Sequence, residues 1–149
     1  MAKEFGYASV QTVAAGSPVI LNNSIPNQCC GSSDIYHEDE TGIITLAGPR
    51  RGGKCNQFAD YKVTFIANIA VPATETPGEI SIGLVQNGEV IPVSIAIQTP
   101  TVVDTYENVT ISKIVRIPRM CGCEDISVEN TSTISINVQN ANLNVARLS

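Results

Sequence analysis

The sequence predicts an all-β fold of two stacked antiparallel sheets, in a single domain spanning residues 1–149. Two observations carry this prediction. Apolar residues alternate with polar ones along most of the chain, which places the apolar side chains on one face of a strand. Gly, Pro, Asn and Asp separate the alternating runs, and helical periodicity is nearly absent. A chain of 149 residues of which 43% are hydrophobic is large enough to bury a core of its own.

The first part of the chain contains four expected strands. Residues 5–14 form the first and residues 18–22 form a short second one. Residues 34–37 and 43–46 are expected to pair as a hairpin, because the polar and glycine-containing segment 38–42 between them has the composition of a turn.

The clearest strand spans residues 61–71. Its odd-numbered positions are all apolar, whereas Lys62, Thr64 and Asn68 occupy even positions. One face of this strand is therefore expected in the core and the other outside it. Pro72 ends the strand, because proline cannot donate to a ladder of backbone hydrogen bonds.

A hairpin and a long strand follow. Alternating apolar residues predict strands at residues 80–84 and 91–97, joined through Asn87-Gly88, a strong two-residue hairpin signal. Residues 106–118 form the next strand. Lys113 interrupts its apolar face, so we expect this lysine near a strand end or at an interface.

The last stretch, residues 125–148, alternates on both sides of a turn expected at residues 130–133 and supplies the closing strand of the sandwich. The apolar positions change from even to odd numbers near Asn140. A bulge or sharp bend there would keep both halves facing the core. The expected strands total about ten.

Composition limits the classes of partner. Charged residues make up 15% of the chain, against roughly 25% in ordinary domains, so the surface is expected to be neutral or partly buried in an assembly. The net charge of −5 disfavours a nucleic-acid partner. No apolar run approaches the roughly 18 residues of a membrane span, and the N-terminus lacks a secretory signal. We therefore expect folding in a cytoplasm, without membrane contact.

The five cysteines lie in three expected loops. Each strand crosses the sandwich from one end to the other, so successive turns alternate between the ends. Counting strands in this way predicts that all three loops meet at one pole. The residues of this disulfide or thiol cluster are Cys29, Cys30, Cys55, Cys121 and Cys123.

Three interpretations of the cluster remain open. Paired disulfides with one thiol left over would staple the three loops together. Reduced thiols would pack as small hydrophobic side chains. A zinc site is the third interpretation, although the spacings C-C and C-G-C suit chelation less well than C-x-x-C.

No catalytic, cofactor or metal residues are predicted. His37 could act as a general base, but its acidic neighbours favour an exposed polar loop. Glu38 and Glu40 could hold calcium, yet a solvated acidic turn is the simpler interpretation. The basic segment 50–54 contains R-G-G, a sequence that can contact nucleic acid. In an acidic protein, we expect it to contact an acidic surface of a neighbouring protein instead.

Three segments carry a resemblance to a known family. They are Y-A-S-V-Q-T-V at residues 7–13, Y-K-V-T-F-I-A-N-I at 61–69 and S-V-E-N-T-S-T-I-S-I-N-V-Q-N-A-N-L-N-V-A-R-L at 127–148. With these segments the chain resembles the C1q/TNF-like jelly-roll superfamily. The resemblance implies a jelly-roll sandwich of about ten strands that assembles as a homotrimer.

A trimer would need residues that face its axis. The candidates for the trimer interface are Tyr61, Phe65, Tyr106, Leu143 and Val145. The alternative for each is an ordinary place in the core of the sandwich.

The start M-A-K-E-F, without a collagen-like tract, makes the chain look most like small phage and prophage proteins. This narrower similarity implies a non-enzymatic structural protein at the virion surface, such as a head-decoration or head-fibre protein. Its partners would be the phage major capsid protein or other virion proteins. The alternative is a trimeric adhesive head that binds a receptor or a glycan. An aromatic content of 5% without tryptophan argues against a glycan site.

Overall fold

The computed structural model describes residues 2–23, 35–37, 40–48, 58–118 and 123–148. Apart from one short 3-10 helix, the regular structure of these residues is entirely β. The elements are β1 (Ala2–Tyr7), β2 (Gln11–Val13), β3 (Asn22–Asn23), β4 (Ile35–His37), β5 (Ile44–Ala47), β6 (Phe58–Ala70), β7 (Ile80–Gln86), β8 (Glu89–Val90), η1 (Pro92–Ser94), β9 (Ala96–Gln98), β10 (Glu107–Pro118), β11 (Cys123–Asn130) and β12 (Ile136–Arg147).

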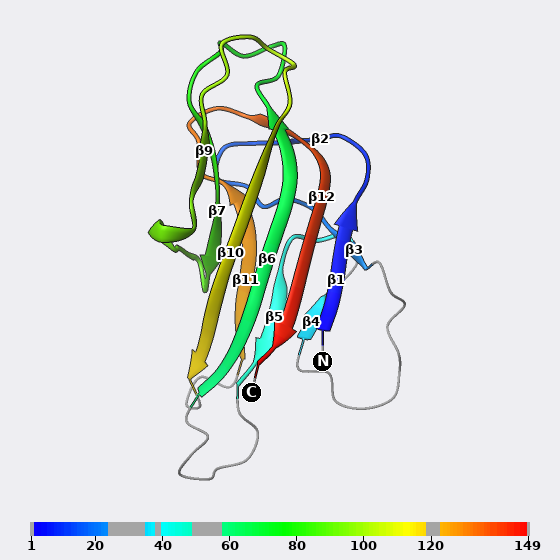
Figure 1. Cartoon of the computed structure of the whole chain (residues 1–149), viewed down its shortest axis with the longest axis vertical. Coiled ribbons are helices and arrows are strands. Elements are labelled where there is room, and N and C mark those ends of the chain that lie inside the picture. The colour runs from blue at the N-terminus through cyan, green and yellow to red at the C-terminus, as the bar shows by residue number, and fades with distance from the viewer. Residues whose placement is uncertain (1, 24–34, 38–39, 49–57, 119–122, 149) are drawn as a thin grey trace.

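The strands form two antiparallel sheets that pack as a sandwich (Figure 1). Sheet A has the order β10-β6-β12-β1-β3, and sheet B has the order β4-β5-β11-β7-β8. In sheet A, β1 and β2 follow one another along the same side of β12, and in sheet B β8 and β9 do so along β7. The strand segments of the described residues therefore fill ten positions, as the sequence predicts.

The core lies between the sheets, and β6 contributes most to it. Along β6 the odd-numbered side chains from Ala59 to Ile69 are at most 1% exposed, which confirms the predicted alternation. Tyr61 also links the two sheets, because its hydroxyl donates a hydrogen bond to the carbonyl of Ala47 on β5. Burying each large apolar side chain contributes roughly 1.5–3 kcal/mol, so this strand anchors the sandwich.

The closing strand β12 is central to sheet A, and its predicted bulge is confirmed. The register between β12 and β6 shifts between Gln139 and Asn142. Asn140 has a φ of 53°, a left-handed conformation that asparagine tolerates better than most residues. Because of this bulge, Val138 before it and Leu143 after it are both fully buried.

Both predicted hairpins are present. β4 pairs with β5, and β7 pairs with β8 through Asn87 and Gly88. The φ values of these two turn residues are 54° and 84°. Two positive values in succession are typical of the turn whose twist matches the flanking strands.

The prediction of one return strand at residues 91–97 is wrong. The strand β8 ends at Val90, and η1 separates it from β9. Pro92 has no N–H to donate, and hydrogen bonds of the Ser94 side chain take the place of the backbone hydrogen bonds that a continuous strand would make. Its hydroxyl donates to the Ile91 carbonyl at 2.7 Å and accepts from the Leu84 N–H at 2.9 Å. The first predicted strand, residues 5–14, is likewise split into β1 and β2.

Lys113 lies in the middle of β10, so the expectation of a strand end is wrong. The strand is at an edge of sheet A, and Lys113 has the same parity as the buried Ile111 and Val115. Its side chain is half-buried. A charge on the inner side of an edge strand discourages further strands from adding there.

Gly42 is required by a close approach between the segment before β5 and the segment before β3. A Cβ atom at residue 42 would lie 2.6 Å from the Val19 carbonyl oxygen and 2.7 Å from the Pro18 Cβ. We expect Gly42→Ala to lower the free energy of unfolding by about 1–3 kcal/mol, because backbone must move to admit the methyl group. Gly78→Ala is the matched control, since a Cβ there meets nothing within 4 Å. Equal midpoints of urea unfolding for the two variants would contradict this expectation.

Candidate functional site

Part of the outer side of sheet A is free of charged residues, and we call this part the neutral face. On the same side, Lys62 and Arg116 lie toward one end, and Glu4 on β1 lies beside Asn142 and Asn144. Three long strands contribute to it, at positions whose side chains alternate with those of the core. Its residues are Thr64, Ile66 and Asn68 on β6, Asn108, Thr110 and Ser112 on β10, and Gln139, Asn142 and Asn144 on β12.

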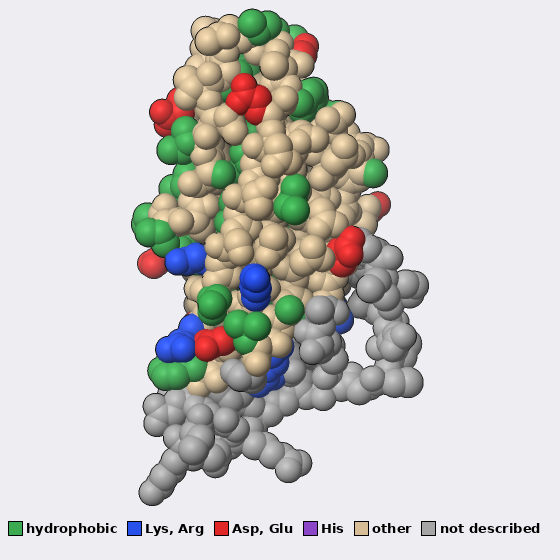
Figure 2. All heavy atoms as spheres, viewed as in Figure 1, with side chains coloured by type: hydrophobic (Ala, Val, Ile, Leu, Met, Phe, Trp, Pro, Cys, Tyr) green, Lys and Arg blue, Asp and Glu red, His purple; other side chains and the backbone are tan. Residues whose placement is uncertain are grey.

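Figure 2 views the molecule from the side of these three strands. The middle of the face is covered mainly by uncharged polar side chains and backbone, and most of the basic side chains lie nearer its lower end. Ile66, which is 40% exposed, lies between Thr64 and Asn68 on this polar side of β6. The nine residues of the face include no charged side chain, against roughly 25% charged residues in ordinary domains.

Side-chain amides on the neutral face contact one another. Asn108 donates to Asn68 at 3.3 Å, and Asn144 donates to Asn142 at 3.0 Å. Asn142 in turn donates to Glu4 on β1 at 2.8 Å. These contacts hold several polar side chains in fixed positions, so less rotamer entropy remains to be lost when a partner covers them.

Side chains of sheet B donate hydrogen bonds to backbone carbonyls on the free edge of β10. Gln98 donates to the Asn108 carbonyl at 3.1 Å, and Gln86 donates to the Arg116 carbonyl at 3.2 Å. Both carbonyls lie near the ends of β10. These glutamines use hydrogen-bonding groups at which another strand could otherwise begin to pair.

One ion pair joins β10 and β6 near the lower end of sheet A. Arg116 donates two hydrogen bonds to Asp60, at 2.8 and 3.0 Å, and its guanidinium carbon lies 4.8 Å from the centre of the Phe58 ring. These hydrogen bonds hold the pKa of Asp60 below its usual value of 3.8. A carboxyl with a lowered folded-state pKa stabilises the fold above its unfolded-state pKa, and this stabilisation is lost as the pH falls through the folded-state value.

We therefore expect Asp60→Asn to have a lower Tm than the wild-type protein at neutral pH. The difference should narrow as the pH falls from 3.8 through the lower folded-state pKa of Asp60, because the wild-type protein then loses this charge as well. The effect is small, since solvent screens exposed pairs. Thermal unfolding of both proteins over an acidic pH series measures it, and a difference that stays constant with pH would contradict the assignment.

The prediction of trimer-interface residues is wrong for four of the five residues. Tyr61, Phe65, Leu143 and Val145 are fully buried within the single chain, so they present no surface to another copy. They lie at odd positions of β6 and β12, which face sheet B, and so occupy the ordinary core positions named as the alternative. Tyr106 is half-buried just before β10, and its role stays a prediction.

The cysteine cluster is described only in part. Cys123 is exposed at the first residue of β11, whereas Cys29, Cys30, Cys55 and Cys121 lie outside the described residues. Strand ends that flank two of the loops do lie at one end of the sandwich, because Phe58 pairs with Pro118 and Cys123 pairs with Ala47. The gathering of all five cysteines stays a prediction.

His37 is buried rather than exposed, which corrects the expectation of a polar loop. It is 2% exposed, its Nε2 lies 2.8 Å from the Thr41 carbonyl, and its ring centre lies 4.7 Å from that of Phe5. The alternation of β4 turns Ile35 and His37 inward and Tyr36 outward. Glu38 and the basic segment 50–54 lie outside the described residues, while Glu40 is exposed. Among the described residues, no group of three or more His, Cys, Asp and Glu side chains could hold a metal ion.

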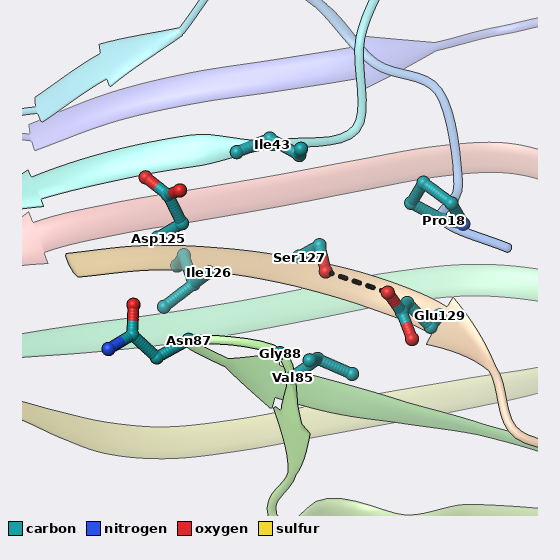
Figure 3. A pocket seen from close by; sticks show the side chains of 9 residues that line it. All are labelled: Pro18, Ile43, Val85, Asn87, Gly88, Asp125, Ile126, Ser127 and Glu129. Carbon is teal, nitrogen blue, oxygen red and sulfur yellow. Dashed lines mark hydrogen bonds between the residues drawn. The ribbon is translucent and has the colours of Figure 1, made fainter. Parts of the chain in front are cut away.

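A groove of about 400 Å³ lies on the outer side of sheet B (Figure 3). It runs along β11, between the segment before β5 and the turn that joins β7 to β8. Apolar and polar side chains alternate around it. The lining residues are Pro18, Ile43, Val85, Asn87, Gly88, Asp125, Ile126, Ser127 and Glu129.

Sequence reasoning missed Ile66, Tyr36 and the groove. A signal was present for Ile66, because an isoleucine at an even position interrupts the polar side of the strand at residues 61–71. The groove carried no such signal. Its residues come from β11, the β7–β8 turn and the segments at residues 18 and 43, and only the sheet order brings these together.

The fold is similar to that of several solved structures. Eiger TNF from S. frugiperda matches with a TM-score of 0.71 and 11% identity, over 100% of this chain and 92% of that one. The globular domain of zebrafish complement 1qA protein matches with a TM-score of 0.55 and 13% identity, over 97% and 94%. PRD1 vertex protein P5 is less similar, with a TM-score of 0.47 and 13% identity, over 99% and 96%.

The first two comparisons and the sheet order show that the chain has the jelly-roll fold of C1q- and TNF-like domains. At these identities the likeness concerns the fold. The sequence matches no protein-family model and no curated protein. No helix within the described residues is long and apolar enough to cross a membrane.

Proposed function

We propose that the protein is a non-enzymatic structural protein of a phage virion, which assembles as a homotrimer and attaches to the capsid as a decoration or head-fibre protein. The observation that carries the proposal is the neutral face of sheet A. It spans three long strands, has no charged side chain among its nine residues, and includes the exposed Ile66.

Electrostatics favours identical copies as the partner that covers this face. The chain has a net charge of −5, so copies that approach through charged surfaces repel one another. Contact through an uncharged face avoids most of this repulsion. The amides of the face supply both donors and acceptors, so two such surfaces can satisfy each other's hydrogen bonds.

The trimeric state comes from the resemblance to the C1q/TNF-like jelly-roll superfamily, and the virion location comes from the narrower resemblance to small proteins of phages and prophages. The low charge content of 15% supports a protein whose surface is largely occupied in an assembly. Attachment through one pole or through the N-terminal strand would leave the other pole exposed on the particle.

Copy number on purified particles tests the virion role. Particles are prepared from the bacterial strain that carries the gene, and the protein is quantified against the major capsid protein by mass spectrometry. We expect a copy number that is a multiple set by capsid symmetry. Absence from the particles, or a handful of copies as a tail adhesin would have, would contradict the proposal.

A further inference from the structure

The outer face of sheet B carries a line of side chains that crosses four neighbouring segments. Tyr36 on β4 lies opposite Thr45 on β5, and Thr45 lies opposite Asp125 on β11. The N–H of Asn87 donates to the Asp125 carbonyl at 2.8 Å, so the β7–β8 turn comes next. Neighbouring strands are roughly 4.8 Å apart, and Tyr36 and Asp125 are therefore separated by about 10 Å.

A second line, beside the first, is largely apolar. Ser127 on β11 lies opposite Val85 on β7. Ile43 lies on the other side of Ser127, because Ile44 pairs with Ile126 and the two segments run antiparallel. Ile43 is 51% exposed. The groove in Figure 3 thus carries apolar side chains such as Ile43 beside polar ones such as Asp125 and Ser127.

The polar groups of the groove keep hydrogen-bonding capacity. Thr45 donates to one oxygen of Asp125 at 2.9 Å, which leaves the other oxygen available. The Ser127 hydroxyl is 3.5 Å from Glu129, too long for a strong hydrogen bond, although Ser127 is only 7% exposed. No basic side chain among the described residues forms a salt bridge with Asp125 or Glu129.

We propose that this groove binds a neutral glycan. Tyr36 is 60% exposed and lies outside the groove lining, beyond Thr45 in the same row as Asp125, and its ring would stack on the apolar face of one sugar ring. Asp125 and Asn87 would exchange hydrogen bonds with the hydroxyls of the next ring. A sugar combines an apolar face with a hydroxyl edge, and the row from Tyr36 to Asn87 offers an aromatic ring and hydrogen-bonding groups about 10 Å apart.

The spacing of the carboxylates argues against a cation as the ligand. Asp125 and Glu129 are four residues apart on one strand, which separates them by roughly 13 Å. Two carboxylates at that distance cannot share one metal ion or one ammonium group. The inference does not depend on the proposed trimer, because the groove lies on the opposite side of the sandwich from the neutral face.

A printed array of defined neutral oligosaccharides tests the proposal with the full-length chain. The best array ligand is then titrated into the wild-type protein and into variants by calorimetry. We expect Tyr36→Ala and Asp125→Asn each to weaken binding by about 10-fold or more. Tyr36→Phe keeps the ring and should bind within about 2-fold of the wild type. Phe58→Ala removes a half-exposed aromatic residue of sheet A and should leave binding unchanged.

Two outcomes would overturn the glycan site: no oligosaccharide is retained above an uncoated surface, or Tyr36→Ala binds as tightly as the wild type. Unfolding curves of each variant establish that loss of binding is not loss of fold. Glycan binding by a monomeric chain would refute the proposed assembly and leave the groove assignment intact.

Discussion

Replacing Ile66 with aspartate should separate the assembled protein into single folded chains. Ile66 is 40% exposed at the centre of the neutral face, with Thr110 opposite it on β10 and Asn142 opposite it on β12. If identical copies cover this face, the variant places an unpaired carboxylate in each contact. Burying such a charge without a partner costs at least about 3 kcal/mol, which weakens each contact by a factor of about 100.

Light scattering after size exclusion measures this effect, and circular dichroism reports whether the β structure remains. Val93→Asp is the matched control, because it makes the same chemical change at a residue of η1 that is 78% exposed. The control should keep the mass of the wild-type protein. An Ile66→Asp variant with unchanged mass, or the same loss in both variants, would show that the neutral face is not the contact.

Replacing Asn130 with alanine should destabilise the fold by about 3–5 kcal/mol. Asn130 is fully buried at the end of β11. Its side-chain amide donates to the carbonyls of Val13 and Ile134, at 3.0 and 2.8 Å, and its side-chain oxygen accepts from the N–H of Ser132 at 2.9 Å. Alanine removes all three hydrogen bonds, one buried and two partly buried. A buried backbone group left without its partner costs about 1–3 kcal/mol.

Urea unfolding at one fixed protein concentration tests this prediction. Thr133→Ala serves as the control, because Thr133 is exposed in the same turn and surface substitutions usually change stability by less than about 0.5 kcal/mol. A loss for Asn130→Ala no larger than that of the control would mean that the three hydrogen bonds contribute little to the fold.

Much of the fold follows from local pattern. The alternation along β6 and β12 predicts which side chains are buried, and the change of parity near Asn140 predicts the bulge. These features depend on the two-residue repeat of a strand, which is visible in any short window of sequence. The interruption at Pro92 and Ser94 was missed because it depends on a side chain that replaces a ladder bond.

The interaction surfaces follow from sequence only in part. Alternation divides a strand into an inner and an outer face, but it does not show whether a partner covers the outer face. Aromatic residues such as Tyr61 and Phe65 were therefore assigned to an interface, although they fill the core. The groove of sheet B depends on sheet order, which joins Tyr36 to Asp125 across a gap of nearly ninety residues.

The solution mass of the wild-type protein is the most direct test of whether identical copies cover the neutral face. Multi-angle light scattering at micromolar concentration should give three times the 15.8 kDa of one chain. A mass of 15.8 kDa would mean that the neutral face is exposed to solvent on a single subunit, and the proposed assembly would then be wrong.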